Sequence, residues 1–594
     1  MAEKIVSPGV FTRENDLSFL PAGIGEIGAA IVGPTVKGTV GIPTLVTSYN
    51  DYVSKFGNTF KSGSDYYQYL TSHAAERYLQ FGGALTVVRV DGANYAAASA
   101  SVGTGSDAFV AGPDATNCSF KLHTLSHGAI MNSVDSITST TPGTNHALSS
   151  GSADNLRWEV TSVNNATGTF NLLIRRGDDT NNNKTILETW NQLSLDPNTS
   201  NYIGKVVGDS YWTVDSSDAA DPFVKETGEY PVKSAYVRVE VLKQTIDYLD
   251  SNGVIRDSGA SGSLPAEGSG SMGGAFGGGA NGTRVSGAEL FYDSITTANC
   301  QGYDFNDLTN TNGGASLNTS LLLLQNQDAY DINMIMIPGM NQKDHGPAVN
   351  KAISVCETRG DAIAIVDPVG HGQTITTAIG ETDDYNTSYA AMYWPWVQIT
   401  DNQLGKNRWV PASVVMPGVL AYNDSVAAEW YAPAGLNRGG ITAIKAERNL
   451  THANRDTLYD NRLNPIATFP GVGLCAWGQK TLQKRASALD RVNVRRLLIN
   501  LKKFIASTSK YLVFENNTSQ TRNRFLSSVV PYMESVQANQ GLFAFKVVMD
   551  ASNNTPDVID RNILKGDIFI QPARAAEFIV VDFNIMPTGA TFND

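Results

Sequence analysis

Two pairs of residues in this chain have types and spacing that could do chemistry. His123 and His127 are four residues apart, a spacing that lets two imidazoles on one helix face bind a metal ion. Asp367 and His371 follow an apolar segment, and the carboxyl end of a strand is where α/β sheets place ligand-binding or catalytic groups. Both pairs also have structural interpretations, because NCSFKLHTLSHGAIMNS is typical of strand and turn and DPVGH is an ordinary turn. We expect structural roles for both.

Other catalytic and cofactor-binding motifs are missing from the sequence. It contains no G-x-x-x-x-G-K-[ST] phosphate loop, no H-E-x-x-H, no EF-hand loop and no G-T-S-M-A-x-P serine segment of a subtilisin. The GGGANG run has neither a preceding buried strand nor a following helix, so it indicates a linker and not a phosphate cradle. We therefore expect a protein that is not an enzyme and that has no catalytic residues, cofactor or metal.

The four cysteines also argue against a metal site. They lie more than fifty residues apart, which fits no zinc motif, and four cysteines in 594 residues do not make a disulfide framework. We expect buried thiols at Cys118, Cys300, Cys356 and Cys475.

The composition predicts several globular domains. With 42% hydrophobic and 17% charged residues, the chain has the balance of a folded protein and not of a disordered one. No apolar run reaches the roughly 18 residues of a membrane helix. The first residues, MAEKIVSPGVF, lack the basic and apolar regions of a signal peptide. These features predict that the protein does not insert into a membrane. They also predict that it assembles in a cytoplasm.

Charge is unevenly distributed along the chain. Between Arg438 and Lys503 there are thirteen Lys or Arg and four Asp or Glu, a net charge of +9. Since the whole chain carries −13, the rest carries −22. Such asymmetry favours a charged partner surface, although a solvated basic face would show the same count.

The first ninety residues predict an arm followed by an α/β segment. Residues 1–20 have no helical period, and Ser7-Pro8-Gly9 predicts a turn in an extended arm. AAIVG and PTLVTS, between residues 28 and 52, predict two strands joined by a Gly/Pro turn. Apolar residues then recur with a 3.6-residue period, which predicts a helix from about Asp65 to Phe81. The apolar run LTVVRV predicts a strand buried on both faces.

Residues 93–300 have a different composition, rich in Ser, Thr, Asn and Gly. Short alternating segments predict strands; in YVRVEV, for example, Val237, Val239 and Val241 share one side. Between residues 253 and 287, twelve of thirty-five residues are Gly, which predicts a flexible surface loop. We interpret the whole region as an inserted β-sandwich or barrel.

Residues 320–372 predict a βαβ unit. DINMIMIPG and DAIAIVDPVG are apolar enough for buried strands, and Pro347 lies near the start of the helix between them. Strands joined in this way are parallel and need helices on both sheet faces.

The last part of the chain predicts an α+β domain. Asn493 could cap a helix that runs to about Ser507, with Arg495 and Lys502 on one flank and Arg496 and Lys503 further round. A strand YLVFE, a helix ending near residue 541 and the strands FAFKVVMD, DIFIQPA and AEFIVVDF are expected to follow.

Six motifs in the last third give the chain a family resemblance. In this order and spacing they resemble the C-terminal part of tail sheath proteins from contractile bacteriophage tails, and the resemblance covers about residues 5–92 and 320–585. Two turns depart from the family pattern, since this chain has Asn516 where F-E-P-N is usual and Pro417 before Gly418. The motifs are SYAAMYWPW (388–396), WYAPAG (430–435), AWGQKTL (476–482), VNVRRL (492–497), YLVFEN (511–516) and PARAAEFI (572–579).

The resemblance implies a multidomain chain of α/β and β type. It implies a subtilisin-like α/β core domain, an α+β C-terminal inner domain and an inserted β-sandwich or barrel domain. The expected boundaries are 1–20 for the N-terminal arm, 21–92 for the first α/β segment, 93–300 for the outer insertion, 301–435 for the subtilisin-like domain, 436–585 for the domain facing the tube and 586–594 for the tail.

The resemblance also implies a mechanical function and its partners. Sheath proteins form hexameric rings that stack helically around a tail tube protein, meet baseplate and tail terminator proteins, and contract to drive the tube through the host envelope. The expected location is the virion tail after assembly in the host cytoplasm, with no nucleic-acid partner. Two alternatives stay open: another viral lattice or capsid protein, and a polyanion-binding protein that uses Arg495, Arg496, Lys502 and Lys503 on phosphates.

Two sets of site residues follow from the resemblance. The N-terminal arm and the last strand are expected to add strands to a neighbouring subunit, and the basic helix flank is expected to face an acidic tail tube. The linkage residues are Val6, Val10, Phe11, Phe578, Val580 and Phe583. The tube-facing residues are Arg495, Arg496, Lys502 and Lys503.

Overall fold

The computed structural model describes residues 28–104, 118–133, 151–180, 182–257, 259–270 and 273–577. Their contacts divide the chain into two compact units. We call them the sheet unit, which contains residues 28–500 and 574–577, and the small unit, which contains residues 501–573. Within the described ranges, no helix is long and apolar enough to cross a membrane.

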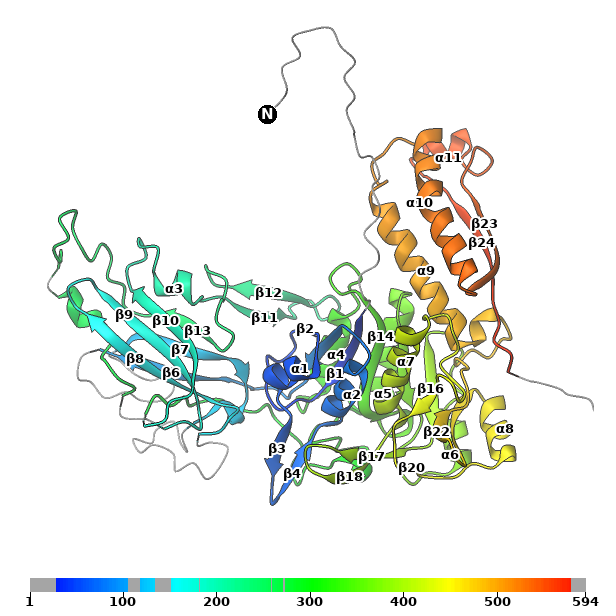
Figure 1. Ribbon diagram of the computed structural model, residues 1–594, viewed down its shortest axis with the longest axis horizontal. Helices are drawn as coiled ribbons and strands as arrows, with labels where there is room; N and C mark the ends of the chain where they lie inside the picture. Colours follow the sequence, from blue (N-terminus) through cyan, green and yellow to red (C-terminus); the bar gives the residue numbers. More distant parts are fainter. Residues whose placement is uncertain are drawn as a thin grey trace, which may run out of the picture. The chain divides into compact units, whose positions relative to one another are not determined.

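A nine-stranded sheet organises the sheet unit (Figure 1). Six central strands are parallel, and antiparallel strands complete both edges. The central strands are apolar on both faces, as a parallel sheet covered by helices requires. In spatial order the strands are β19 (Gly440–Ile441), β22 (Gly473–Ala476), β21 (Leu463–Phe469), β16 (Ala390–Trp394), β15 (Ile363–Asp367), β14 (Ile332–Asn341), β1 (Gly28–Gly33), β5 (Leu85–Arg89) and β2 (Thr44–Val46).

Helices cover both faces of this sheet. Ala29 and Ile31 of β1 belong to the same apolar cluster as residues of α2 (Leu70–Leu79) and α7 (Ala412–Val426). Alternate residues of the same strand lie in the cluster formed with α4 (Gly314–Leu323) and α5 (Gln342–Arg359). Smaller elements surround this core: α1 (Tyr49–Phe56), β3 (Thr59–Ser62), β4 (Asp65–Gln68), α6 (Ile375–Gly380), β17 (Val397–Asp401), β18 (Lys406–Val410), β20 (Lys445–Ala446), α8 (His452–Asp460) and two 3-10 turns, η3 (Tyr292–Ser294) and η4 (Ala488–Asp490).

The βαβ prediction is confirmed, because β14 and β15 are parallel neighbours joined by α5. The predicted helix from Asp65 to Phe81 is wrong in its first turn: residues 65–68 form β4, paired with β3, and the helix begins at Leu70. The helix α1 was not predicted from the sequence. Its start is fixed by Ser48, because the Ser48 side chain accepts a hydrogen bond from the Asp51 N–H. All four cysteines are buried thiols, as expected.

The inserted region forms two three-stranded antiparallel sheets. Phe120 of one sheet and Phe170 of the other stack with ring centroids 5.7 Å apart, so apolar side chains fill the space between the sheets. The first sheet contains β6 (Ala97–Gly103), β7 (Cys118–His127) and β13 (Val237–Val241); the second contains β8 (Leu156–Asn164), β9 (Thr169–Arg176) and β10 (Ile186–Ser194). Two 3-10 turns, η1 (Ala129–Met131) and η2 (Ala260–Ser263), the short helix α3 (Ile203–Val206) and the hairpin β11 (Tyr211–Asp215) with β12 (Phe223–Thr227) complete the region.

The Gly-rich segment is built into this β structure, which corrects the prediction of a flexible surface loop. Its backbone bridges to β8 at Val160 through Gly268, and to β6 at Ser99 through Gly277. The side chain of Phe276 is fully buried. The segment therefore joins an edge strand of each sheet. Its glycines allow this close backbone approach: a Cβ on Gly274 would lie 2.0 Å from the Trp158 carbonyl oxygen.

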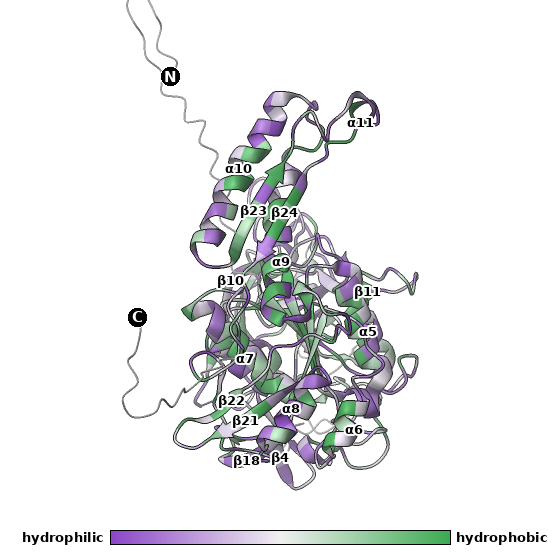
Figure 2. Cartoon of the chain, turned by 90° about the vertical axis from the view of Figure 1, so that its right-hand side faces the viewer, coloured by the Kyte–Doolittle hydropathy of each residue, from purple (hydrophilic) through white to green (hydrophobic). Residues whose placement is uncertain are grey.

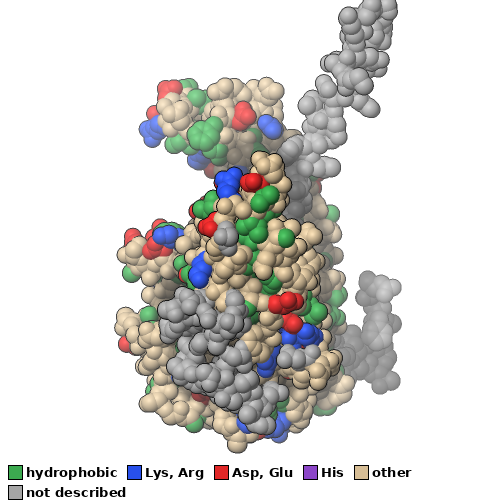
Figure 3. All heavy atoms as spheres, turned by 90° about the vertical axis from the view of Figure 1, so that its left-hand side faces the viewer, with side chains coloured by type: hydrophobic (Ala, Val, Ile, Leu, Met, Phe, Trp, Pro, Cys, Tyr) green, Lys and Arg blue, Asp and Glu red, His purple; other side chains and the backbone are tan. Residues whose placement is uncertain are grey.

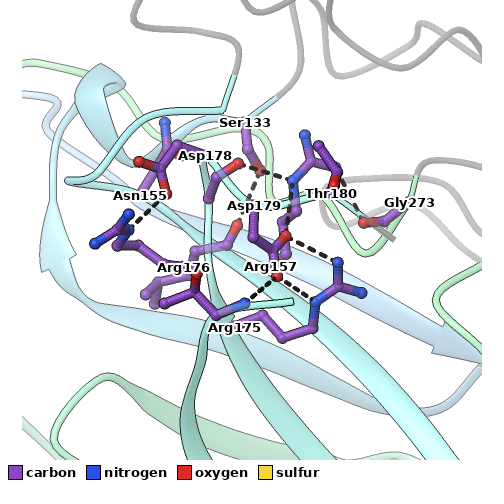
Figure 4. Close-up of polar contacts among 12 residues, drawn as sticks. Ser133, Asn155, Arg157, Arg175, Arg176, Asp178, Asp179, Thr180 and Gly273 are labelled. Carbon is purple, nitrogen blue, oxygen red and sulfur yellow. Dashed lines mark hydrogen bonds and ion pairs between the residues drawn. The ribbon is translucent and has the colours of Figure 1, made fainter. Parts of the chain in front are cut away.

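A polar network fastens the same segment from the side (Figure 4). Arg157 of β8 donates from Nη1 to the carbonyl of Gly273 (3.1 Å) and from Nε to that of Gly177 (2.8 Å). The fully buried Arg175 donates to both carboxylate oxygens of Asp179, at 2.6 and 2.8 Å. Since these buried charges are paired and hydrogen-bonded, the network is structural.

The charged side chains on the described part of the exposed face of the insertion are dispersed (Figure 3). Figure 3 shows this side of the molecule, where Lys, Arg, Asp and Glu are scattered in small groups among uncharged side chains. No broad surface of one charge covers this view.

A buried carboxylate ties together the two ends of the insertion. Asp91 is fully buried and accepts hydrogen bonds from the Arg89 guanidinium (2.7 Å), the backbone N–H groups of Gly92 (2.9 Å) and Gly282 (3.2 Å), and the hydroxyl of Tyr303 (3.0 Å). The two glycines touch back to back, since a Cβ on Gly282 would lie 2.1 Å from the Gly92 oxygen. The chain therefore enters and leaves the insertion through one narrow neck.

The small unit is a helical pair on a two-stranded sheet (Figure 2). It contains the second half of α9 (Val492–Lys510), α10 (Ser519–Ala538), β23 (Leu542–Val548), α11 (Pro556–Asp560) and β24 (Asp567–Pro572). The predicted strand at 511–515 is wrong, because these residues form turns. The boundary also differs from the expected one at residue 436, because β19, β21 and β22 extend the large sheet.

The close packing of the Gly-rich segment can be tested by substitution. Gly274→Ala should lower the free energy of unfolding of the insertion by roughly 2–4 kcal/mol, since the methyl group meets the Trp158 carbonyl and the backbone φ is +77°. Urea unfolding followed by the fluorescence of the buried Trp158 measures the change. Gly262→Ala is the control, because nothing lies within 4 Å of its Cβ position, and it should change stability by less than about 0.5 kcal/mol. Equal effects of the two variants would restore the surface-loop interpretation.

Candidate functional site: a polar clamp on helix α9

Charged side chains from the first half of α9 point into the sheet unit. Arg495 is 4% exposed; its guanidinium donates to the Ser388 hydroxyl and lies 4.1 Å from the centre of the Tyr389 ring. Burial lowers the pKa of Arg495, and Tyr389 opposes this effect. The Arg495 guanidinium therefore makes two contacts, a hydrogen bond and a cation–π contact, and together they hold α9 against the residues that precede β16.

Arg496 connects α9 to α7 by an ion pair. It is 2% exposed and forms a two-pronged ion pair with Asp424 near the end of α7, with Nη1 2.8 Å from Oδ1 and Nη2 bonded to Oδ2. Burial alone would lower the pKa of Arg496, but the Asp424 carboxylate outweighs burial and raises it. The pair therefore holds α9 against α7 through two directional hydrogen bonds between opposite charges.

Two asparagines extend the clamp to the central sheet. Asn500 donates to Glu429 (3.1 Å), and the other oxygen of Glu429 accepts from Asn333 of β14 (3.3 Å). Asn493 donates to the backbone carbonyl of Trp430 (3.2 Å). This position corrects the prediction that Asn493 caps the helix: α9 begins at Val492, so Asn493 already lies inside it.

A second carboxylate clamp lies where the described chain ends. Both oxygens of Glu577 accept from Arg491, at 2.7 and 2.9 Å, and the carboxylate also accepts from the hydroxyl of Tyr459 (2.8 Å) and the amide of Gln479 (3.2 Å). Burial raises the pKa of Glu577, but the hydrogen bonds from Arg491 and Tyr459 outweigh it and hold that pKa below its usual range. Residue 577 is thereby fixed to the sheet unit.

The motifs that were separate in the sequence meet at these two clamps. SYAAMYWPW supplies Ser388 and Tyr389, WYAPAG supplies the Trp430 carbonyl, and AWGQKTL supplies Gln479. VNVRRL contributes the α9 side chains and PARAAEFI contributes Glu577. Five of the six motifs therefore contribute to one polar assembly, whereas YLVFEN lies wholly in the small unit.

These contacts correct half of the predicted tube-facing set. Arg495 and Arg496 are buried and bound within their own chain, so they present no charge outward; for the same reason they are not available to phosphates. Lys502 is exposed and Lys503 half-buried, both in the part of α9 that belongs to the small unit. The predicted linkage residues lie outside the described residues: Val6, Val10, Phe11, Phe578, Val580 and Phe583.

The basic segment as a whole uses its charge internally. Six of its cations lie over aromatic rings within 6 Å of the ring centre, where the negative face of the ring attracts them. The net charge of the segment therefore overstates the charge available to a partner. These residues are Arg438, Lys445, Arg455, Lys480, Arg491 and Arg495.

The two residue pairs considered for catalysis or metal binding have structural surroundings. Asp367, the last residue of β15, is buried and accepts hydrogen bonds from the backbone N–H (2.9 Å) and the hydroxyl of Ser413 at the start of α7. Burial raises the pKa of Asp367 to about 7. His371 instead packs against two tryptophan rings, with centroids 5.0 and 5.7 Å away.

The histidine pair lies on β7, where its members have different partners. His123 contacts Glu240 (2.8 Å), whereas Nδ1 of His127 accepts from the Val40 N–H (3.1 Å). Among the described residues, no group of three or more His, Cys, Asp or Glu side chains is arranged to bind a metal ion.

The ligand-binding position of α/β folds, at the carboxyl end of β14, is occupied by the chain itself. Gln301 accepts a hydrogen bond from the Leu70 N–H (2.8 Å), and the Cys300 thiol contacts the Gly339 carbonyl (3.4 Å). Both side chains are fully buried. The segment that returns from the insertion therefore covers this end of the strand.

Comparisons with known proteins agree on one family. Residues 311–482 match the model of the phage tail sheath protein central domain, and residues 485–586 match that of the phage tail sheath C-terminal domain. The tail sheath protein of Vibrio phage KVP40 is 37% identical over 245 residues, which cover 41% of this chain and 36% of the relative. The tail sheath protein of Enterobacteria phage T4 is 39% identical over 223 residues, 37% of this chain and 34% of the relative. The chain thus matches about a third of the length of these two relatives.

A solved structure supports the overall fold. The sheath tail protein from Listeria innocua is 11% identical and has a TM-score of 0.52, with 93% of this chain and 96% of that chain covered. At this identity, the likeness concerns the mixed α/β, multidomain fold alone.

The Arg496–Asp424 pair can be tested by removing one partner. Arg496→Ala should lower the free energy of unfolding of the sheet unit by about 2–3 kcal/mol, because Asp424 loses its counter-charge; the carboxylate is 27% exposed, so water offsets part of the loss. Arg256→Ala is a matched control, since its pair with Asp247 is about half exposed, and it should cost less than about 1 kcal/mol. Chemical unfolding of both variants measures the difference. Similar losses in the two variants would show that the clamp is no stronger than a surface pair.

Proposed function

We propose that this chain is a structural subunit of a contractile tail sheath, because residues 311–482 and 485–586 match the models of the central and C-terminal domains of phage tail sheath proteins. The subunit polymerises as stacked hexameric rings around a tail tube protein, meets baseplate and tail terminator proteins in the virion tail, and contracts to drive the tube through the host envelope. Assembly takes place in the host cytoplasm, and neither catalysis nor nucleic-acid binding is part of this function.

The polar assembly on α9 is the observation that supports this proposal best. During contraction, a sheath subunit must move as a rigid body while its contacts with neighbouring subunits are kept. The Arg496 and Glu577 clamps fix the first half of α9 and the segment around residue 577 within the sheet unit through charge-assisted hydrogen bonds. Such contacts resist displacement, and they involve the motifs that identify the family.

The strand order supports a domain assignment. We propose that residues 21–92 and 301–435, together with the strands β19, β21 and β22 that extend the same sheet, form a subtilisin-like α/β domain, since β1 and β5 pair directly into the sheet that contains β14 and β15. The insertion at 93–300, as a β-sandwich or barrel, lies on the outside of the sheath, where its narrow neck leaves the sheet undisturbed. The C-terminal region, as the inner domain, faces the tube.

The terminal arms supply the linkage between subunits. Residues Val6–Glu14 and Phe578–Ile585 add strands to a neighbour, and the sheet of β23 and β24 offers an open edge on each side within the described residues. A two-stranded sheet is marginal by itself, so added strands would also stabilise it. Main-chain hydrogen bonds of this kind survive rotation of the subunit bodies.

Lys502 and Lys503 supply the contact with the tube. They belong to the small unit, and with Arg495 and Arg496 buried they are the remaining cations of the predicted flank. Exposed ion pairs are worth about 0–1 kcal/mol each and weaken with salt. A weak, reversible grip suits a sheath that must release the tube when it contracts.

The arm linkage can be tested by truncation. A chain without residues 1–20 should keep its fold and its unfolding transition but should not form polymers, because the strand that enters the neighbour is gone. Circular dichroism checks the fold, and sedimentation with electron microscopy checks the polymers. Removal of residues 586–594, which lie beyond the proposed strand, is the control and should leave assembly intact. Normal tubes from the shorter chain would contradict the linkage.

The tube contact can be tested by reversing charge. The double variant Lys502→Glu and Lys503→Glu should polymerise without tube yet fail to assemble on tubes at low salt, because like charges then face each other. The control is Lys546→Glu, an exposed cation on β23 of the same unit. If the double variant cannot polymerise even without tube, the two lysines serve the sheath lattice and the tube contact is wrong.

A further inference from the structure

One aromatic side chain of the small unit is fully exposed in a strained conformation. Phe514, in the turn between α9 and α10, has its whole side chain in solvent and a backbone φ of +71°. Residues other than glycine rarely adopt this left-handed region, and such strain is found where surrounding structure or function requires it. The next residue, Glu515, is also exposed and forms no ion pair within the described parts of the chain. Together they form an apolar knob with an adjacent negative charge.

The sheet unit carries a cleft whose lining complements this knob, because it combines apolar side chains with a cation. It has a volume of about 350 Å³ and lies among α2, α7, β19 and β22. Its walls include Phe81, Leu436 and Val472, which are 47%, 48% and 57% exposed. A volume at the lower end of the range for small-molecule pockets, about 300–1,000 Å³, suits a single aromatic ring.

An unpaired cation lines this cleft. Arg77, in the last turn of α2, is 9% exposed, and its Nε is buried without a hydrogen-bond partner. Within the described ranges, no carboxylate pairs with its guanidinium, whereas Arg89, Arg175, Arg359 and Arg496 all have such partners. A buried guanidinium without a counter-charge is costly, so this cleft favours a ligand that brings an anion together with an apolar group.

We propose that Phe514 and Glu515 of one copy dock into this cleft on a second copy, with the ring against the apolar wall and the carboxylate on Arg77. The knob and the cleft match in polarity and charge, and both are present on every chain. Because they are different surfaces, the contact is head-to-tail, and a contact of this type builds rings or helical polymers. This inference rests on the proposed sheath function, and it assigns a side-chain contact separate from the strand exchange of the arms.

The contact can be tested by disulfide trapping between two full-length chains. One chain carries Val513→Cys, an exposed position beside Phe514 that leaves the ring in place, and the other carries Thr442→Cys, an exposed position lining the cleft. On mild oxidation, the mixture should give a covalent dimer of twice 63.6 kDa, and each chain alone should not. The four native cysteines are buried, so their background is low. Ile563→Cys, a half-exposed position in the same unit, replaces Val513→Cys in the control and should not cross-link.

A charge exchange tests the ion pair. Glu515→Arg should lower the cross-linking yield at least tenfold, and adding Arg77→Glu to the Thr442→Cys partner should restore it; Glu534→Arg on α10 should have no effect. Yields equal to the Ile563→Cys control would overturn the proposal. So would a variant Phe514→Ala that polymerises normally but no longer assembles on tubes, since Phe514 would then face the tube.

The outcome separates this contact from the arm linkage. In the chain without residues 1–20, cross-linking should persist although polymers are lost. Polymers in that chain would contradict the arm linkage and leave the knob contact standing. Loss of cross-linking with the fold intact would show that the knob does not bind independently of the arms, which contradicts the proposal.

Discussion

Strand β1 is hydrogen-bonded to β5 on one side and to β14 on the other, and within the described sheet the β1–β14 pairing joins the two strands that lie furthest apart in the sequence. For β5 and β14 both to pair with β1, the chain must leave the sheet near Asp91 and return near Tyr303 at the same place. Closing so long a loop costs entropy, but this cost rises only slowly with length. Burial of the central strands on both faces offsets it. The neck at Asp91, the helices on both faces and the clamp on α9 all depend on this pairing.

The sequence predicted those elements whose structure is decided by neighbouring residues, and it failed where a distant segment decides the structure. β5 and β14 were predicted because an unbroken apolar run has few other structures available to it. β4 was missed because residues 65–68 also fit a helical period, and only the partner strand β3 selects the extended form. The Gly-rich segment was misinterpreted for a related reason. Glycine without periodicity predicts a linker, yet here small size allows the backbone to pass within contact distance of Trp158.

The site was predicted as a set of residues but not as a set of contacts. Arg495 and Arg496 were recognised as important cations on the flank of a helix, and their direction was wrong. Helical geometry gives the angle between two side chains, but the face that is buried depends on what packs against it. The partner of Arg496 lies on α7, in a part of the sequence that carries no motif. Likewise, the charge count of the basic segment could not show that six cations lie on aromatic rings.

The glycine neck gives the insertion a modular character. Two chain segments enter side by side at Gly92 and Gly282, and four donors hold them on one carboxylate. A different domain with similarly close ends could occupy this position without changing any strand of the nine-stranded sheet. Natural selection could therefore vary the outer surface of such a subunit rapidly while the mechanical core stays constant. The buried contacts around Asp91 would then be the boundary between a variable outer domain and a constant sheet.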